Sequence, residues 1–210
     1  MPNPPPVEML DTVYAAKSAA EIARSYDDWA DSYDAEMASL GYRHPAICLA
    51  LLCRHIPAGS APILDAGAGT GLIGEWLRIV GYPSAEALDI STGMLAVARR
   101  KGVYDRLHQA ALGTRLPFDD GYFAGVVSAG VFTTGHVGVE GLEDLIRVTR
   151  PGGALVLTVK DTVWAEGFSQ RVRELEAAGI LTLLEETPAY VSMPGRPETL
   201  PARGVALRVA

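Results

Sequence analysis

The sequence predicts a doubly wound α/β fold, in which helices cover both faces of a mostly parallel β-sheet. Short apolar runs alternate with amphipathic segments between Ile63 and Val159, and strands that alternate with helices pair in parallel through right-handed crossovers. A glycine-rich turn follows the first apolar run, as in nucleoside-binding folds of this class. The length of 210 residues supports one full hydrophobic core with an appendage rather than two domains.

The N-terminal quarter of the chain precedes this alternation. Residues 1–9 are proline-rich, and we expect them to form a disordered tail. Helical periodicity then runs from Leu10 to about Met37. Pro45 marks the first turn of a further helix that ends near His55, because its missing N–H costs nothing at that position. Residues 10–58 are too few for a domain of their own, so we expect an appendage to the domain at residues 59–210.

The later elements follow in a regular order. Strands are expected at residues 63–66, 85–89, 107–112, 122–129 and 154–159, with helices at 72–80, 92–101 and 138–148. The C-terminal part departs from this alternation, because a helix at 165–178 is followed by apolar runs at 181–184, 189–192 and 204–210. Strands that follow one another without a helix predict an antiparallel hairpin at the edge of the sheet.

The most informative segment is Ile63–Gly74, where an apolar strand enters a turn with glycine at alternate positions. Glycine allows positive φ and has no Cβ, so a ligand can lie against the backbone there. Part of the segment, Gly69–Gly74, also matches the dinucleotide fingerprint. Asp65 places a carboxylate beside the loop, which repels a pyrophosphate and suits a ligand with an ammonium group. A tight turn without any ligand is the structural alternative.

Asp89 ends the second predicted strand, where nucleoside-binding folds place an acid that accepts the ribose hydroxyls. Its alternative role is to cap the helix that follows. Further segments accompany the glycine loop in a fixed order: Tyr26–Asp34, Leu40–Arg43, Leu88–Ser91 with Met94, Leu116–Phe118, Phe123–Val127 and Val148–Gly153.

Together these segments resemble the class I S-adenosylmethionine-dependent methyltransferases, over most of the chain from about Tyr26. Within this family the chain is most similar to the methyltransferase-like proteins related to the Williams-Beuren syndrome critical region product, through Leu40–Arg43 and Arg147–Gly153. The resemblance implies a Rossmann-like seven-stranded sheet, mostly parallel with an antiparallel last strand. It also implies that residues 10–58 form an N-terminal helical lid.

The resemblance further implies S-adenosylmethionine as cofactor and S-adenosylhomocysteine as product. The cofactor-binding positions that it implies are Tyr26, Tyr33, Arg43, Asp65, Gly67, Ala68, Gly71, Asp89, Ile90, Met94, Leu112 and Gly113. Asp65 and the loop would hold the methionine part, Arg43 would face its carboxylate, and Asp89 would bind the ribose. Many relatives carry an acid for the adenine amino group where this chain has Leu112, so here the adenine would rely on backbone groups.

Methyl transfer from a sulfonium needs a positioned nucleophile more than covalent help. The candidate general base is His136, just beyond the fourth predicted strand, where open α/β sheets place their ligand crevice. A histidine that only hydrogen-bonds its neighbours is the alternative. Four residues are expected to wall an acceptor pocket, with packing in the core as the alternative for the aromatic ones: Trp29, Phe132, Thr133 and Trp164.

Composition narrows the class of partner. The 25 acidic residues against 18 basic ones give a net charge of −7, which disfavours nucleic acid. No apolar stretch approaches the roughly 20 residues that span a bilayer, and the N-terminus lacks the pattern of a signal peptide, so we expect a cytoplasmic protein. The cysteines and histidines show no metal-ligand spacing. We therefore predict methyl transfer to a small molecule, with a dinucleotide-dependent oxidoreductase and a non-catalytic S-adenosylmethionine-binding protein as alternatives.

Overall fold

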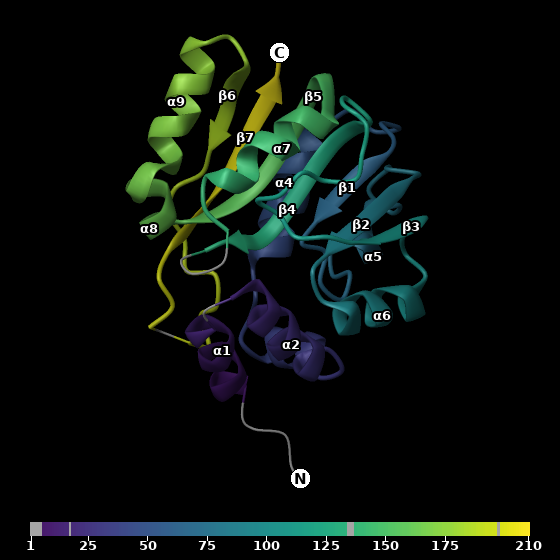
Figure 1. Ribbon diagram of the computed structural model, residues 1–210, viewed down its shortest axis with the longest axis vertical. Helices are drawn as coiled ribbons and strands as arrows, with labels where there is room; N and C mark the ends of the chain where they lie inside the picture. The colour runs from purple at the N-terminus through teal and green to yellow at the C-terminus, as the bar shows by residue number, and fades with distance from the viewer. Residues whose placement is uncertain (1–5, 17, 134–136, 197) are drawn as a thin grey trace.

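The computed structural model describes residues 6–16, 18–133, 137–196 and 198–210. Its centre is a seven-stranded sheet in the order β3-β2-β1-β4-β5-β7-β6 (Figure 1). The strands are β1 (Ile63–Ala66), β2 (Ala85–Asp89), β3 (Arg106–Gln109), β4 (Phe123–Phe132), β5 (Thr149–Lys160), β6 (Leu181–Glu186) and β7 (Ala202–Val209). The strands from β3 to β5 pair in parallel, whereas β7 is antiparallel to both of its neighbours. This topology confirms the predicted sheet.

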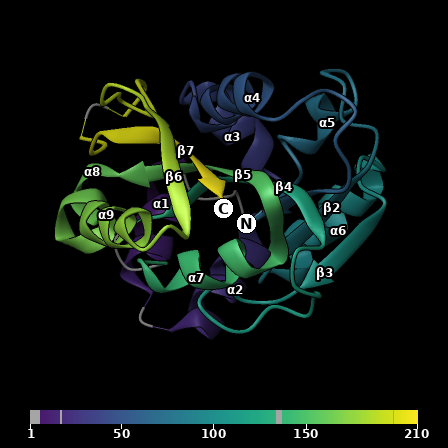
Figure 2. The same cartoon turned by 90° about the horizontal axis from the view of Figure 1, so that it is seen from above.

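Helices cover both faces of the sheet, with α4 and α5 on one side and α7 on the other (Figure 2). Alternation along the strands explains the two layers, since Ile63 packs in the core beneath α4 and α5 while Leu64 packs in the core beneath α7 and α9. The helices of these layers are α4 (His44–His55), α5 (Gly74–Leu77), α6 (Thr92–Lys101), α7 (Glu140–Val148), α8 (Asp161–Val163) and α9 (Ser169–Ala177).

Several elements differ from the sequence prediction. The helix expected at 72–80 spans only Gly74–Leu77, and the strand expected at 154–159 already begins at Thr149. The strand expected at 107–112 ends at Gln109; the Ala110 amide still donates to the Asp89 carbonyl at 3.1 Å, and Ala110–Leu112 line a cavity. The run at 189–192 forms only an isolated bridge between Tyr190 and Ala202. The helix expected at 165–178 starts late, because the π-helical turn Trp164–Phe168 contains Gly167 at φ 140°, a backbone conformation outside the helical range.

The N-terminal helices α1 (Pro6–Ala15), α2 (Ala19–Trp29) and α3 (Tyr33–Ser39) lie at the carboxyl ends of the parallel strands (Figure 1). They share a small core of their own, made of Leu10, Val13, Trp29, Met37, Leu40 and Met193. Because α1 begins at Pro6, the last residues of the predicted tail are helical. We call α1, α2 and α3 the lid.

The helix α4 was included in the predicted lid region, but the structure places it on the sheet. Its residues Cys48, Leu51 and Leu52 are fully buried in the core that contains Ile63 and Val127. The segment from residue 10 to residue 58 therefore divides at the end of α3. None of the helices in the described ranges is both long enough and apolar enough to cross a bilayer.

Acidic residues of the segment Tyr26–Asp34 hold the lid on the rest of the molecule. The Oδ1 atom of Asp27 accepts hydrogen bonds from the Ser91 hydroxyl at 2.6 Å and from the Gly93 amide at 2.7 Å. Asp34 accepts a hydrogen bond from the Thr70 hydroxyl and pairs with Lys101 at 2.6 Å. The lid is thus attached directly to the glycine loop and to the start of α6.

Candidate functional site

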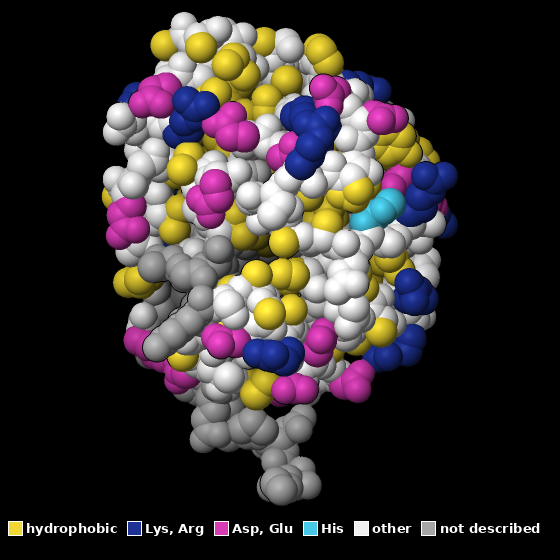
Figure 3. All heavy atoms as spheres, in the orientation of Figure 1, with side chains coloured by type: hydrophobic (Ala, Val, Ile, Leu, Met, Phe, Trp, Pro, Cys, Tyr) yellow, Lys and Arg dark blue, Asp and Glu magenta, His cyan; other side chains and the backbone are white. Residues whose placement is uncertain are grey.

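A cavity lies between the lid and the carboxyl ends of β1, β2 and β4. In the space-filling view the molecule is hollowed between the lid and the sheet, with hydrophobic side chains around the hollow (Figure 3). The described residues that line it are Ala19, Ile22, Tyr26, Tyr33, Tyr42, Gly67, Gly69, Leu88, Asp89, Ile90, Met94, Ala110, Ala111, Leu112, Ala129, Gly130, Val131 and Val137. Mostly apolar walls with one buried acid suit a ligand with a planar apolar part and a few polar groups.

Most of the predicted cofactor-binding positions meet at this cavity. Its walls include Tyr26, Tyr33, Gly67, Asp89, Ile90, Met94 and Leu112. Asp65 and Ala68 line a smaller adjoining cavity, which shares Tyr33 and Gly67 with the first. Gly71 and Gly113 line neither cavity; both have positive φ, and a Cβ at Gly71 would lie 3.1 Å from the Tyr104 ring. Glycine at these two positions therefore permits the backbone turns and does not line a ligand-binding surface.

Two glycines of the loop, Gly67 and Gly69, line the cavity with backbone atoms alone. Gly67 has φ 76°, and a Cβ there would lie 2.2 Å from Cγ2 of Val131, across the cavity wall. The amides of Gly67 and Ala68 both donate to the Leu88 carbonyl, at 2.7 and 3.0 Å. The loop is thus fixed to the end of β2, and its bare backbone faces the cavity.

Asp89 connects the loop to the next helix. Its Oδ2 accepts a hydrogen bond from the Gly69 amide and its Oδ1 accepts one from the Ser91 amide, both at 2.8 Å. The side chain that caps α6 is that of Ser91, which accepts from the Met94 amide at 3.0 Å, so the alternative role of Asp89 as the helix cap is not observed. Burial raises the pKa of Asp89, and these backbone donors oppose the rise. The carboxylate retains acceptor capacity for hydroxyl groups of a ligand.

Asp65 is a buried acid, only 1% exposed. Its Oδ2 accepts a hydrogen bond of 2.5 Å from the Tyr104 hydroxyl, and no cationic side chain of the described residues forms an ion pair with it. Burial raises the pKa of Asp65 to about 7, the charge of Asp89 adds to the rise, and the Tyr104 hydrogen bond opposes it. A ligand ammonium beside this carboxyl group would supply the missing counter-charge.

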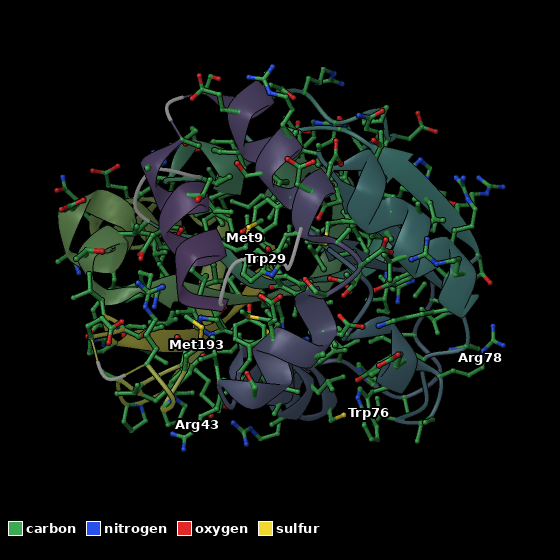
Figure 4. All side chains as sticks on the ribbon, turned by 90° about the horizontal axis from the view of Figure 1, so that it is seen from below. Met9, Trp29, Arg43, Trp76, Arg78 and Met193 are labelled. Atoms are coloured by element: carbon green, nitrogen blue, oxygen red, sulfur yellow. The ribbon has the colours of Figure 1, made fainter. Side chains whose placement is uncertain are left out.

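The structure corrects the prediction for Arg43. Its side chain is exposed, and its Nη1 donates to the Val191 carbonyl at 3.4 Å. Seen from below, Arg43 lies at the edge of the molecule, away from the central Trp29 and Met193 (Figure 4). Arg43 precedes α4, whose docking on the sheet turns this side chain outward, so it lines none of the cavities described above.

The predicted acceptor residues divide into two groups. Trp29 and Thr133 line a third cavity, next to the first. Phe132 and Trp164 do not line it; Phe132 is fully buried against Phe168, with ring centroids 5.3 Å apart, and Trp164 packs on the same core. Both therefore belong to the core, as the alternative assigned to them states. His136 lies outside the described residues.

Several residues that line the cavity were not among the predicted positions, and Gly130 and Tyr42 are two of them. Gly130 adopts φ 75°, and a Cβ there would lie 2.1 Å from the Tyr42 hydroxyl, so these residues form one side of the cavity. The signal was available, since Gly130 follows the fourth predicted strand at the same sheet edge as the glycine loop. No cluster of three or more metal-ligating side chains occurs among the residues that the structure describes.

Comparison with known proteins finds one matching family model and similar proteins of two types. Residues 64–157 match the model of a methyltransferase domain. Methyltransferase-like protein 27 of Homo sapiens is 34% identical over 183 residues, which are 82% of this chain and 74% of the relative. Demethylmenaquinone methyltransferase of Beutenbergia cavernae is 35% identical over 152 residues, 71% of this chain and 62% of the relative.

Among solved structures, a TehB-like SAM-dependent methyltransferase from Corynebacterium glutamicum superposes with a TM-score of 0.63 at 20% identity. The superposition covers 88% of this chain and 98% of the other. At this identity the likeness establishes the fold, whereas the assignment to a family depends on the sequence relatives.

Proposed function

Because the chain belongs to the family of S-adenosylmethionine-dependent methyltransferases, we propose that it transfers a methyl group to a small-molecule acceptor held beneath the lid. The observation that carries this proposal is the pair of buried acids, Asp65 and Asp89, on either side of a glycine loop with an open backbone. Asp65 would hold the ammonium of the cofactor, Asp89 its ribose hydroxyls, and Ile90 and Met94 its adenine.

When bound, S-adenosylmethionine supplies an electrophilic methyl group: the acceptor forms the new bond to carbon while the carbon–sulfur bond breaks and its electron pair stays on sulfur. The residues of the chain position the acceptor and exclude water, which contributes up to roughly 7–11 kcal/mol in well-oriented reactions. The Tyr33 ring packs edge to face against Tyr26 and Trp29, whose own rings are nearly parallel, and the three form an aromatic wall at the lid side of the third cavity.

Two observations support a small acceptor. Demethylmenaquinone, the substrate in the name of several relatives, is a small molecule. Lys and Arg side chains are interspersed with Asp and Glu on the face that opens to the cavity (Figure 3), and the net charge is −7. A phosphate backbone needs a continuous basic surface, so these features favour a small molecule over a nucleic acid.

The buried position of Asp65 predicts that cofactor binding depends on pH. A ligand ammonium favours the ionised carboxylate, so binding lowers the pKa of Asp65 from its value of about 7 and releases a proton. Below pH 7 the free protein holds that proton, and affinity falls as pH falls. We expect S-adenosylhomocysteine to bind roughly tenfold more weakly at pH 6 than at pH 8, measured by calorimetry in buffers of different ionisation enthalpy.

The matched control is Asp65→Asn, which has the same shape but cannot ionise. Its affinity should be lower than that of the natural chain and independent of pH over this range, because the ammonium and carboxylate of the ligand do not titrate there. A natural chain with the same affinity at pH 6 and pH 8 would contradict the assignment of Asp65 to the ligand ammonium.

We further propose that His136 is the general base that removes a proton from the methyl acceptor, because it follows β4 in the sequence, where open α/β sheets place their ligand crevice. The variant His136→Ala should bind S-adenosylhomocysteine normally and transfer methyl groups about 100-fold more slowly, the lower end of the usual contribution of a general base. Product formation is followed with a panel of phenols, naphthols and quinols. His108, which hydrogen-bonds Glu86 at 2.6 Å, provides the control variant His108→Ala. Unchanged turnover in His136→Ala would remove the proposed role.

A further inference from the structure

A further cavity, of about 320 Å³ and called the second cavity from here on, lies at the carboxyl end of β5 beside residues 193–196 and 198–200. Its described walls carry three charged side chains and three hydroxyl groups: Lys160, Arg196 and Glu198, and Thr133, Thr162 and Thr199. None of the charged residues was singled out by sequence reasoning, because the cationic residues are 36 positions apart and meet only through the pairing of β5 with β7 and the loop before it.

Lys160 is unusual among these residues because its ammonium group is buried and has only neutral hydrogen-bond acceptors. It is the last residue of β5 and is only 6% exposed. Its Nζ donates to the Leu200 carbonyl at 2.8 Å and to the Ser192 hydroxyl at 3.3 Å, both neutral acceptors. The adjacent acid, Asp161, is paired with Arg203 at 2.9 Å. A buried ammonium without a counter-ion is unfavourable, and burial together with Arg196 lowers the pKa of Lys160 to about 8.

Two further donors at this cavity are buried without a hydrogen-bond partner among the described residues. They are Nη1 of Arg196 and Oγ1 of Thr199. The rest of the Arg196 guanidinium is satisfied, since Nη2 pairs with Asp11 and Nε with Glu198, both at 2.6 Å. Arg196 thus has two carboxylates beside it, whereas none of the described acids forms an ion pair with Lys160, whose hydrogen-bond acceptors are both neutral.

The third cavity lies between the second and the first, since it shares lining residues with both. The third cavity shares Tyr26, Tyr33, Tyr42 and Gly130 with the first, and Thr133, Lys160 and Met193 with the second. Trp29 and Met193, which both line the third cavity, lie towards the middle of the molecule seen from below (Figure 4). The walls of the three cavities therefore form a continuous row of side chains from the glycine loop, past apolar residues, to Lys160.

Resting on the methyl transfer proposed above, we propose that the methyl acceptor carries a carboxylate and that the second cavity binds it. Lys160 supplies the counter-charge, and Arg196 Nη1 and Thr199 Oγ1 supply hydrogen bonds. A carboxylate fits better than a phosphate, because one negative charge balances Lys160, and a dianion would place excess charge beside Glu198. The acceptor is thus a small apolar molecule with one carboxylate end.

Benzoate is the probe for this site, and benzamide is its uncharged equivalent. Each is titrated into the full chain in the presence of S-adenosylhomocysteine and followed by NMR. We expect benzoate to bind and benzamide to bind at least tenfold more weakly, since a charge-assisted pair is lost. Lys160→Met should weaken benzoate binding to the same extent. Arg150→Met, an exposed residue on the same strand, changes the net charge equally and should leave benzoate binding unchanged.

A second variant, Thr199→Val, tests the same site if Lys160→Met does not fold. Thr199→Val removes one donor and keeps the shape of the side chain, and it should weaken benzoate binding at least threefold. With S-adenosylmethionine labelled in its methyl group, nuclear Overhauser effects to the benzoate ring are expected, because both ligands occupy neighbouring cavities.

Several outcomes would overturn the proposal: equal binding of benzoate and benzamide, benzoate binding retained in folded Lys160→Met or Thr199→Val, or inorganic phosphate that displaces benzoate at equal concentration. The first two outcomes are expected if Lys160 is only structural and serves to hydrogen-bond β5 to Ser192 and Leu200. The proposed function is tested separately by S-adenosylhomocysteine alone. If that ligand does not bind, the methyl transfer fails, while the benzoate titration still reports on the anion site.

Discussion

Asp89→Ala is expected to weaken S-adenosylhomocysteine binding by about 10- to 100-fold, equivalent to roughly 1.4–2.8 kcal/mol. Hydrogen bonds to a charged acceptor each contribute roughly 1.5–3 kcal/mol, and alanine removes the acceptor for the ribose hydroxyls. The same change frees the Gly69 and Ser91 amides, which Asp89 holds at 2.8 Å, and so loosens the glycine loop. Calorimetric titration of the purified variant measures the effect.

The control for this variant is Asp105→Ala. Asp105 lies before β3, is 45% exposed at its side chain, and pairs with Arg78, so its loss changes the net charge equally without touching the cavity. Affinity should stay within twofold of the natural chain, or about 0.4 kcal/mol. If Asp89→Ala is folded and binds as tightly as Asp105→Ala, Asp89 does not hold the ribose.

Gly67→Ala is expected to abolish ligand binding and to lower the free energy of unfolding by about 2–5 kcal/mol, the sum of a left-handed backbone penalty and an overpacking penalty. Gly67 has φ 76°, and its new Cβ would lie 2.2 Å from Cγ2 of Val131. The comparison is Gly69→Ala, where φ is 55° and nothing lies within 4 Å of the new Cβ. That variant should lose only about 1–2 kcal/mol.

Chemical denaturation of both variants separates the two contributions. The double variant Gly67→Ala with Val131→Ala should recover part of the loss, because it removes the close contact and leaves only the backbone penalty and the small cavity at Val131. If Gly67→Ala and Gly69→Ala lose the same amount, the contact with Val131 does not limit this position.

Much of the fold could be predicted because its signals are local. The strands β1 and β2 and the helix α6 match the expected residues 63–66, 85–89 and 92–101. In each case a buried apolar run or a serine cap determines the ends, as Ser91 does for α6. The start of α9 was missed because Gly167 breaks the helix through a backbone angle that composition alone does not reveal.

The candidate site was predictable where it depends on one loop and less so where it depends on packing between distant segments. Asp89, Gly67 and Met94 follow from a strand, a turn and a helix that are contiguous in the chain. Arg43 was misplaced because its direction depends on how α4 docks on the sheet, and Lys160 was missed because its neighbours come from a loop 30 to 40 residues away.

The central claim is that the cavity under the lid binds a nucleoside with an ammonium group, as in S-adenosylmethionine, and not a dinucleotide. Calorimetric titration of the unmodified chain with S-adenosylhomocysteine and, separately, with NADH tests it most directly. We expect S-adenosylhomocysteine to bind in the micromolar range, about −8 kcal/mol, and NADH to give no binding heat, because the Asp65 carboxylate beside the glycine loop repels its pyrophosphate. Binding of NADH without binding of S-adenosylhomocysteine would contradict the claim.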